Sequence, residues 1–342
     1  MIMMPLTEYC TLNMGQSPDS KTYNTQGNGL PFYQGNADFG ETHPITRVWC
    51  SAPVKVAEDG DILISVRAPI GAMNMAVERC CIGRGLAALT PIRNKCSKLF
   101  LYYALQSKVD SLIAQGTGST FKAISKKVLE ATCIPAYSTI EQVQIAEIIG
   151  RVDNTIAARR NQLVLLDQLV KSRFIELFGD PVTNSLGLNT MPLGKACCLK
   201  AGITTSADMI HEQSNVFSVP CYGGNGIRGY VESATQCGCY PIIGRQGALC
   251  GNVQLATGKF HATEHAVLVT PLIEANVVWL FYLLKMMDLY RFHTGAAQPG
   301  LAVKTLNTVD IPIADVAVQQ QFASFVEQTD KSKLCGKMEV AA

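Results

Sequence analysis

Apolar residues recur in steps of three and four along one long stretch near the middle of the chain, residues 138–178. They fall at Ile145, Ile149, Val152, Ile156, Leu163, Leu166, Val170 and Leu177. This spacing is typical of the seam of a coiled coil. At 1.5 Å per residue, such a helix would extend roughly 60 Å, which is longer than an ordinary domain needs. The pattern therefore predicts a spacer helix, with a long core helix of a single domain as the alternative.

The chain on either side of this helix shows the same short landmarks in the same order. The matching pairs are Met4-Pro5-Leu6 with Met191-Pro192-Leu193, residues 99–110 with 277–288, Thr117-Gly118 with Thr294-Gly295, and Ile134-Pro135 with Ile311-Pro312. Residues 99–110 and 277–288 each read as an amphipathic helix that carries aromatic side chains. Agreement over this many landmarks predicts two copies of one unit, each a globular part followed by a helix.

Each globular part has a mainly β pattern. Residues 61–66, 240–243 and 267–269 are short runs of apolar, often β-branched residues, and glycine-rich turns separate such runs, which predicts strands. The second long helix begins near Ala314 and carries Phe322, Phe325 and Val326 before it becomes polar. Two such helices in a chain that must return to its start would most simply lie antiparallel.

The predicted fold class is therefore α+β, with two mainly β domains separated by two long helices that pack as an antiparallel coiled coil. The predicted boundaries are 1–137 for the first globular domain, 138–180 for the central helix, 181–313 for the second globular domain and 314–342 for the C-terminal helix. The two long helices would act as a spacer between the domains.

Composition narrows the functional classes. The chain has 342 residues, of which 48% are hydrophobic and 16% charged, so it can bury real cores and is not disordered. No apolar run has the length of a membrane span, and no basic-then-apolar leader opens the chain. The cytoplasm is the expected location, no membrane partner is expected, and the thirteen cysteines are expected to be reduced thiols. The net charge is only +2, so any grip on nucleic acid is expected to depend partly on a partner.

The search for catalytic chemistry finds no strong motif. The glycine-rich turns Gly83-Arg84-Gly85 and Gly223-Gly224-Asn225-Gly226 do not match a phosphate loop. The group Cys237, Cys239, His261 and His265 lacks the Cys-x-x-Cys spacing of a structural zinc site. We therefore predict no catalytic residue, bound metal or resident cofactor. A Cys/His metal-dependent hydrolase remains as an alternative, and so does a binding protein in which the coil joins two carbohydrate- or peptide-binding domains.

Polar, planar and cationic side chains collect in the predicted loops of both globular parts. The candidates for contact with DNA are Gln16, Ser17, Lys21, Tyr23, Gln34, Asn36, Arg67, Arg84 and Lys122 in the first part, and Tyr222, Asn225, Arg228, Arg245, Gln246, His265 and Lys304 in the second. Arginine suits guanine or phosphate, and asparagine or glutamine suits adenine. Each residue taken singly is equally compatible with an ordinary turn or surface position.

Several of these segments together resemble the specificity (S) subunits of type I restriction-modification systems. The similar segments are MGQSP at 14–18, LPFYQG at 30–35, GDILISVRAPIG at 60–71, CIGRGL at 81–86, SRFIELFG at 172–179, YGGNGIRGY at 222–230, IGRQG at 243–247 and TEHA at 263–266. The resemblance covers nearly the whole chain in the order of that family. The short, weakly heptad C-terminal helix departs from the family pattern.

The resemblance implies two target recognition domains, each of which reads one half of an asymmetric bipartite site in double-stranded DNA. It implies that the paired helices hold the domains apart and dock two methyltransferase (modification) subunits, while restriction/translocase subunits join for cleavage. The S subunit of that family carries no catalytic residues. The complex as a whole acts as an adenine DNA methyltransferase and endonuclease through its other subunits. S-adenosylmethionine and ATP are accordingly expected on partner subunits.

Overall fold

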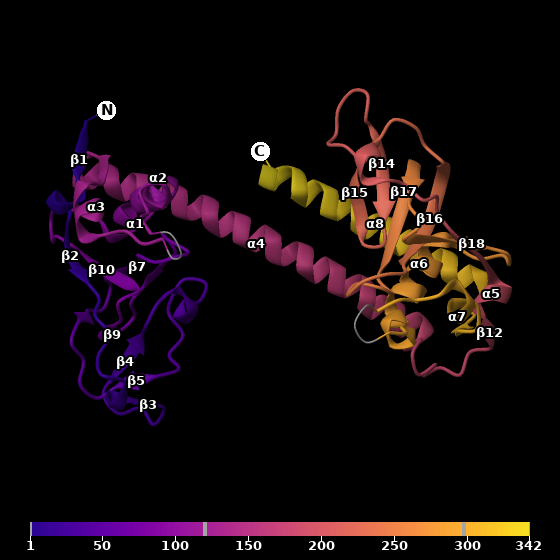
Figure 1. Cartoon of the computed structure of the whole chain (residues 1–342), viewed down its shortest axis with the longest axis horizontal. Coiled ribbons are helices and arrows are strands. Elements are labelled where there is room, and N and C mark those ends of the chain that lie inside the picture. The colour runs from indigo at the N-terminus through magenta and orange to yellow at the C-terminus, as the bar shows by residue number, and fades with distance from the viewer. Residues whose placement is uncertain (1, 119–121, 296–298, 342) are drawn as a thin grey trace. The chain divides into compact units, whose positions relative to one another are not determined.

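The computed structural model describes residues 2–118, 122–295 and 299–341, with side chains described up to residue 334 (Figure 1). Residues 1 and 342, which bound the first and the last predicted segments, lie outside the described residues. The chain divides into two compact units, Met1–Thr155 and Ile156–Ala342. None of the described helices combines the length and apolar character that crossing a membrane requires.

The first unit consists of short strands and three short helices, followed by the start of a long helix. Its strands are β1 (Met3–Pro5), β2 (Cys10–Met14), β3 (Tyr23–Asn24), β4 (Leu30–Tyr33), β5 (Trp49–Cys50), β6 (Val56–Ala57), β7 (Ile62–Ser65), β8 (Met73–Met75), β9 (Cys80–Ile82), β10 (Leu86–Pro91) and β11 (Cys133–Pro135). Its helices are α1 (Lys98–Gln106), α2 (Val109–Ala114), α3 (Lys126–Ala131) and the beginning of α4 (Thr139–Phe178).

A four-stranded sheet in the order β2-β10-β7-β8 forms the centre of the first unit. Alternate residues of a strand face opposite sides of a sheet. Ile62 and Ile64 of β7 therefore pack on the helical side with Phe100 of α1, whereas Leu63 packs on the other side with Tyr33. Tyr33 belongs to a second sheet, β3-β5-β4-β9-β6, in which β4 and β9 pair in parallel. In Figure 1, helices α1 to α3 and strands β3 to β5 lie at opposite ends of this unit.

The second unit repeats the plan with longer strands. Its strands are β12 (Thr190–Pro192), β13 (Cys197–Ala201), β14 (Val219–Gly223), β15 (Gly226–Val231), β16 (Gln236–Gly244), β17 (Val253–Ala262), β18 (Ala266–Pro271) and β19 (Asp310–Pro312). Its helices are the end of α4, α5 (Leu193–Ala196), α6 (Val277–Met286), α7 (Val303–Asn307) and α8 (Val316–Ala341).

One six-stranded sheet, β13-β18-β16-β17-β14-β15, takes the place of the four-stranded and five-stranded sheets of the first unit. Strands β14 and β17 pair in parallel at Cys221 with His261 and Tyr222 with Ala262, as β4 and β9 do in the first unit. Helix α6 packs against β16, β17 and α8. The strand predictions at 61–66, 240–243 and 267–269 are confirmed by β7, β16 and β18, and the helix predicted at 99–110 is interrupted between α1 and α2.

The end of α4 packs on α8 through aromatic side chains inside the second unit. Phe322 of α8 contacts Phe174 and Phe178 of α4 at ring-centroid distances of 5.4 and 5.6 Å. Farther from these rings, Lys333 Nζ of α8 lies 2.8 Å from Asp167 Oδ1 of α4. Later residues of α8 thus meet earlier residues of α4, so these two segments run antiparallel.

The predicted apolar seam of α4 agrees with the structure only in part. Val170 is fully buried, but so are Phe174 and Phe178, which the predicted seam did not include. Val152 was predicted to lie on the seam and is 52% exposed, so that prediction is wrong. The rings of Phe174 and Phe178 lie in the core of the second unit, because an aromatic ring buries more apolar surface than the aliphatic side chains of the predicted seam.

Candidate nucleic-acid interface

Backbone hydrogen bonds gather the loops at one edge of the first unit. The amide of Gln16 donates to the carbonyl of Ile82 at 3.0 Å, and the amide of Gly85 donates to the carbonyl of Gln34 at 3.2 Å. The amide of Val66 donates to the carbonyl of Gly85 at 2.9 Å. The loops that follow β2, β4, β7 and β9 are thereby held together. The candidates Gln16, Ser17, Gln34, Arg67 and Arg84 come together there.

A polar side-chain contact orients the centre of this group. Gln34 Nε2 donates to Ser17 Oγ at 2.9 Å, and the same oxygen accepts from the backbone amide of Arg84 at 3.2 Å. The Gln34 side chain is exposed, and so is that of Arg84. The exposed side chains of Gln34 and Arg84 therefore start from two loops that Ser17 links, and the backbone of these loops is fixed.

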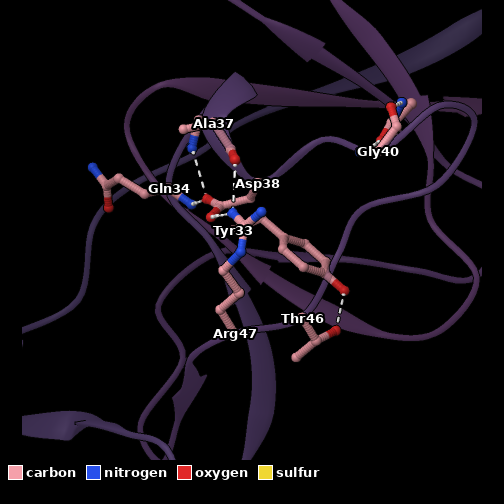
Figure 2. Close-up of polar contacts among 9 residues, drawn as sticks. Tyr33, Gln34, Ala37, Asp38, Gly40, Thr46 and Arg47 are labelled. Carbon is pink, nitrogen blue, oxygen red and sulfur yellow. Dashed lines mark hydrogen bonds and ion pairs between the residues drawn. The ribbon is translucent and has the colours of Figure 1, made fainter. Parts of the chain in front are cut away.

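Figure 2 shows how the Gln34 loop is held from behind. Asp38 Oδ2 accepts from the backbone amide of Gln34 at 2.7 Å, and Arg47 Nη1 lies 3.8 Å from Asp38 Oδ1 and donates to the carbonyl of Ala37 at 2.8 Å. The Gln34 side chain points away from Asp38. Asn36, a half-buried residue, begins the 3₁₀ turn Asn36–Asp38. It shapes this loop, whose outward side chain is that of Gln34.

The remaining candidates of the first unit divide into supporting and exposed residues. Tyr23 stacks on Phe32 at 4.6 Å and donates from its hydroxyl to the carbonyl of Pro18 at 3.0 Å, and burial raises the pKa of Tyr23. Lys21 is exposed. The carbonyl of Lys122 accepts from the amide of Ala68 at 3.1 Å, so the exposed Lys122 lies next to the Arg67 loop in the backbone.

The second unit has the same backbone frame around its own loops. Four backbone hydrogen bonds of the first unit each have a counterpart in the second. The bond from Gln16 N to Ile82 O corresponds to that from Ile203 N to Ala262 O, and the bond from Gly83 N to Tyr33 O corresponds to that from Thr263 N to Tyr222 O. Likewise, Val66 N to Gly85 O corresponds to Arg245 N to His265 O, and Ile124 N to Val66 O corresponds to Leu301 N to Arg245 O. By this correspondence, Arg84 and Glu264 occupy equivalent positions in the two units, and so do Arg67 and Gln246. The frame is the same in the two units, but the side chains on it differ.

Two glycines make the frame possible. A Cβ on Gly15 would lie 2.1 Å from the carbonyl oxygen of Gly83, and a Cβ on Gly202 would lie 2.2 Å from that of Ala262. Both separations are far below van der Waals contact. Any side chain at either position would therefore push the loop after the strand away from the turn that it contacts.

A hollow of about 610 Å³ opens on the frame of the second unit. Its lining includes Asn225, Arg228, Gln246 and His265, four of the predicted candidates. Asn225 accepts a hydrogen bond from Asn252 Nδ2 through its Oδ1. Amide, imidazole and guanidinium groups therefore converge on one concave surface, as recognition of a polar ligand requires.

Glu264 supports this surface and was not predicted to do so. Its Oε1 lies 3.1 Å from His265 Nε2, and its Oε2 accepts from the amide of Thr205 at 3.2 Å. Burial alone would raise the pKa of Glu264, but backbone amide donors, with His265 and Arg228 nearby, hold that pKa below its ordinary value. An acidic residue directly before a histidine was the available signal in the sequence.

Three predicted candidates of the second unit lie outside the lining of the hollow. Arg245 is half-buried, and no hydrogen-bond partner for its buried Nε appears among the described atoms. Tyr222 packs edge-on against Phe260 at 5.5 Å. Lys304 is exposed on α7, a helix that packs on α5 and β13. The hollow therefore brings together four of the seven candidates that were predicted in the second unit.

The structure gives the metal-hydrolase alternative no support. Cys237 and Cys239 are exposed on β16. His261 is buried, its Nε2 lies 2.8 Å from Thr205 Oγ1, and burial lowers the pKa of His261. Within the described part of the chain, no three His, Cys, Asp or Glu residues are grouped so that they could hold a metal ion.

Comparisons with known proteins agree with this architecture. The family model described as the type I restriction modification DNA specificity domain matches residues 2–166 and 199–336. The protein assigned as the specificity subunit of type I restriction enzyme MjaX of Methanocaldococcus jannaschii is 40% identical over 164 residues, which cover 48% of this chain and 39% of that protein. The EcoprrI specificity subunit of Escherichia coli is 41% identical over 139 residues, covering 40% and 35%. The matches thus span less than half the length of these two relatives.

A solved structure extends the likeness of fold over the whole chain. The crystal structure of the type I restriction-modification S subunit from M. genitalium matches 99% of this chain and 92% of its own, with a TM-score of 0.67 and 17% sequence identity. At this identity the match concerns the fold alone. Because the family model matches both repeats of the chain, the protein belongs to the family of type I restriction-modification specificity subunits.

Proposed function

We propose that this chain is a non-catalytic DNA-recognition subunit in which each unit reads one half of an asymmetric bipartite site in double-stranded DNA. The observation that carries the proposal is the shared hydrogen-bond frame, which presents Gln34 and Arg84 in one unit and borders the hollow lined by Arg228, Gln246 and His265 in the other. Equal frames would approach DNA in equal ways, and unequal side chains would select different bases.

The long helices would set the separation of the two readers. We propose that α4 and α8 pack as the antiparallel coiled coil predicted from the sequence, and that its outer surface docks two methyltransferase subunits. One residue more or fewer in a helix changes its length by about 1.5 Å and its rotation by about 100°. A spacer of this kind would therefore specify both the distance and the facing of the half-sites.

The chemistry would lie on other chains. Methyltransferase subunits would bring S-adenosylmethionine, and restriction/translocase subunits would bring ATP. The net charge of +2 fits this division, because proteins that hold DNA unaided usually neutralise several phosphates. The subunit would fix the register in which a partner flips its target adenine out of the stack.

Exchange of the first reader tests the proposal. Residues 1–135 are replaced by the corresponding domain of another family member, and the modified sites in host DNA are mapped by methylation sequencing. One half-site is expected to change while the other half-site stays the same. A simultaneous change of both half-sites would contradict the two-reader model.

A further inference from the structure

A fully buried glutamine occupies the first turns of both long helices. Gln142 of α4 and Gln319 of α8 are each 0% exposed. They are equivalent in the repeat, since each lies eight residues after the matching Ile134 and Ile311. A buried amide side chain must satisfy its donors and acceptor within the protein, so its partners show what it holds together.

Two of the hydrogen bonds of Gln142 have counterparts at Gln319. Gln142 Oε1 accepts from the amide of Ser97 at 2.9 Å, and its Nε2 donates to the carbonyl of Tyr137 at 2.9 Å and to that of Lys95 at 3.1 Å. Ser97 is the N-cap residue of α1. Each bond ends on backbone rather than on a mobile side chain.

The second unit repeats this arrangement. Gln319 Oε1 accepts from the amide of Asn276 at 2.8 Å, and Nε2 donates to the carbonyl of Ala314 at 2.9 Å. Asn276 is the N-cap residue of α6, as Ser97 is of α1. In each unit, one side chain therefore ties the start of the long helix to the chain segment before it and to the start of another helix of the same unit.

From this arrangement we infer that Gln142 and Gln319 are positioning residues that fix the direction in which each long helix leaves its own unit, and thereby fix the spacing of the half-sites that the protein accepts. The inference rests on the proposed function. A tilt of the helix start against its unit would break bonds to two separate backbone segments at once. An apolar side chain of equal length would fill the space but leave the tilt unopposed.

Selection from a DNA library tests this inference. Full-length protein with bound type I methyltransferase subunits selects from double-stranded DNA of random sequence, for wild type, Gln142→Met and Gln319→Met. The matched controls are Gln144→Met and Gln321→Met, at exposed positions two residues farther along the same helices. Thermal unfolding measured in parallel shows that each variant is folded, and Gln142→Asn replaces Gln142→Met if the latter does not fold.

The expected result is a change of spacing alone. The preference of wild type for its own gap over gaps one base pair longer or shorter should fall at least fivefold in the Gln142 and Gln319 variants, with half-site sequences unchanged and with controls like wild type. An unaltered gap distribution, or altered half-site bases, would overturn the inference. If wild type itself selects no bipartite motif, the proposed function fails instead.

Discussion

At the residue scale, the notable feature is that matched backbone positions carry opposite charges. Arg84 of the first unit is exposed, whereas Glu264 of the second is half-buried and bonded to Thr205 and His265. A guanidinium can donate to guanine O6 and N7 or to a phosphate, and a carboxylate cannot. The acidic residue instead orients the imidazole beside it. The two loops therefore offer different chemistry from one backbone geometry.

Replacing Arg84 tests whether it reads a base. The Arg84→Ala variant is expected to lose about 1–3 kcal/mol of binding free energy on the specific site, the value of a bidentate base contact. Competition binding with specific and random DNA measures the loss. Arg93→Ala is the control, because Arg93 is also exposed but follows the opposite end of β10. An equal loss on all sequences would identify Arg84 as a phosphate contact.

His261 predicts a pH dependence for the second unit. Burial lowers the pKa of His261 below its ordinary 6.5, so the unfolded chain takes up a proton at a higher pH than the folded one. Folding stability is then lost as the pH falls below about 6.5. Denaturant unfolding at pH 7.5 and 5.5 should show a smaller decrease for His261→Gln than for wild type. Equal decreases would contradict the assignment.

At the element scale, aromatic packing joins α8 to α4 within the second unit. Phe322 is fully buried and contacts Tyr282 of α6 at 5.3 Å as well as the two α4 rings. Trp279 of α6 contacts Phe178 at 6.2 Å. Three helices therefore share one cluster of rings, and each stacked or edge-on pair adds to the burial of apolar surface.

Removing the central ring should loosen this cluster. The Phe322→Ala variant is expected to lower the free energy of unfolding of the second unit by about 3–5 kcal/mol, because it leaves a cavity among rings that cannot collapse fully. Urea denaturation followed by circular dichroism measures it. The control Leu334→Ala lies on the same helix at a 60% exposed position and should change stability by less than about 0.5 kcal/mol.

The sequence predicts individual strands better than it predicts which strands pair with each other. Strands β7, β16 and β18 follow from local runs of apolar residues, because β propensity and periodicity are local signals. The parallel pairs β4 with β9 and β14 with β17 join strands distant in the chain. No local pattern in the sequence encodes such pairs.

The candidate interface was predictable as a set of loops but not as a geometry. The Ser17–Gln34 contact joins two loops through the fold, and the sequence shows only that both residues suit polar recognition. Glu264 is not among the predicted candidates, because its contact with Thr205 joins residues that are 59 positions apart in the chain. Phe174 was missed because the seam was read from aliphatic residues.

At the scale of the whole molecule, the proposed function divides sequence recognition from general attraction to DNA. The charge of the chain is nearly balanced, with 29 basic and 27 acidic residues. A ligand with one negative charge per phosphate would therefore gain little non-specific attraction from the chain as a whole. Partners that add positive charge would complete the clamp.

The salt dependence of binding tests this division. The chain alone is expected to show a shallow decrease of log affinity with log salt concentration, and the chain with methyltransferase subunits a steeper one, since the slope is about −0.9 per neutralised phosphate. Fluorescence anisotropy on one duplex over a series of salt concentrations measures both slopes. Equal slopes would mean that this subunit makes most of the phosphate contacts itself.

The hydrogen bonds of the shared frame run between backbone atoms, and Gly15 and Gly202 keep its close approach open. The outward side chains around that frame take no part in these backbone hydrogen bonds. If each unit reads one half-site as proposed, single substitutions of these side chains would change the bases recognised in one half-site, while the protein stays folded and the other half-site is unchanged. A change of the recognised DNA sequence would then cost the protein little stability.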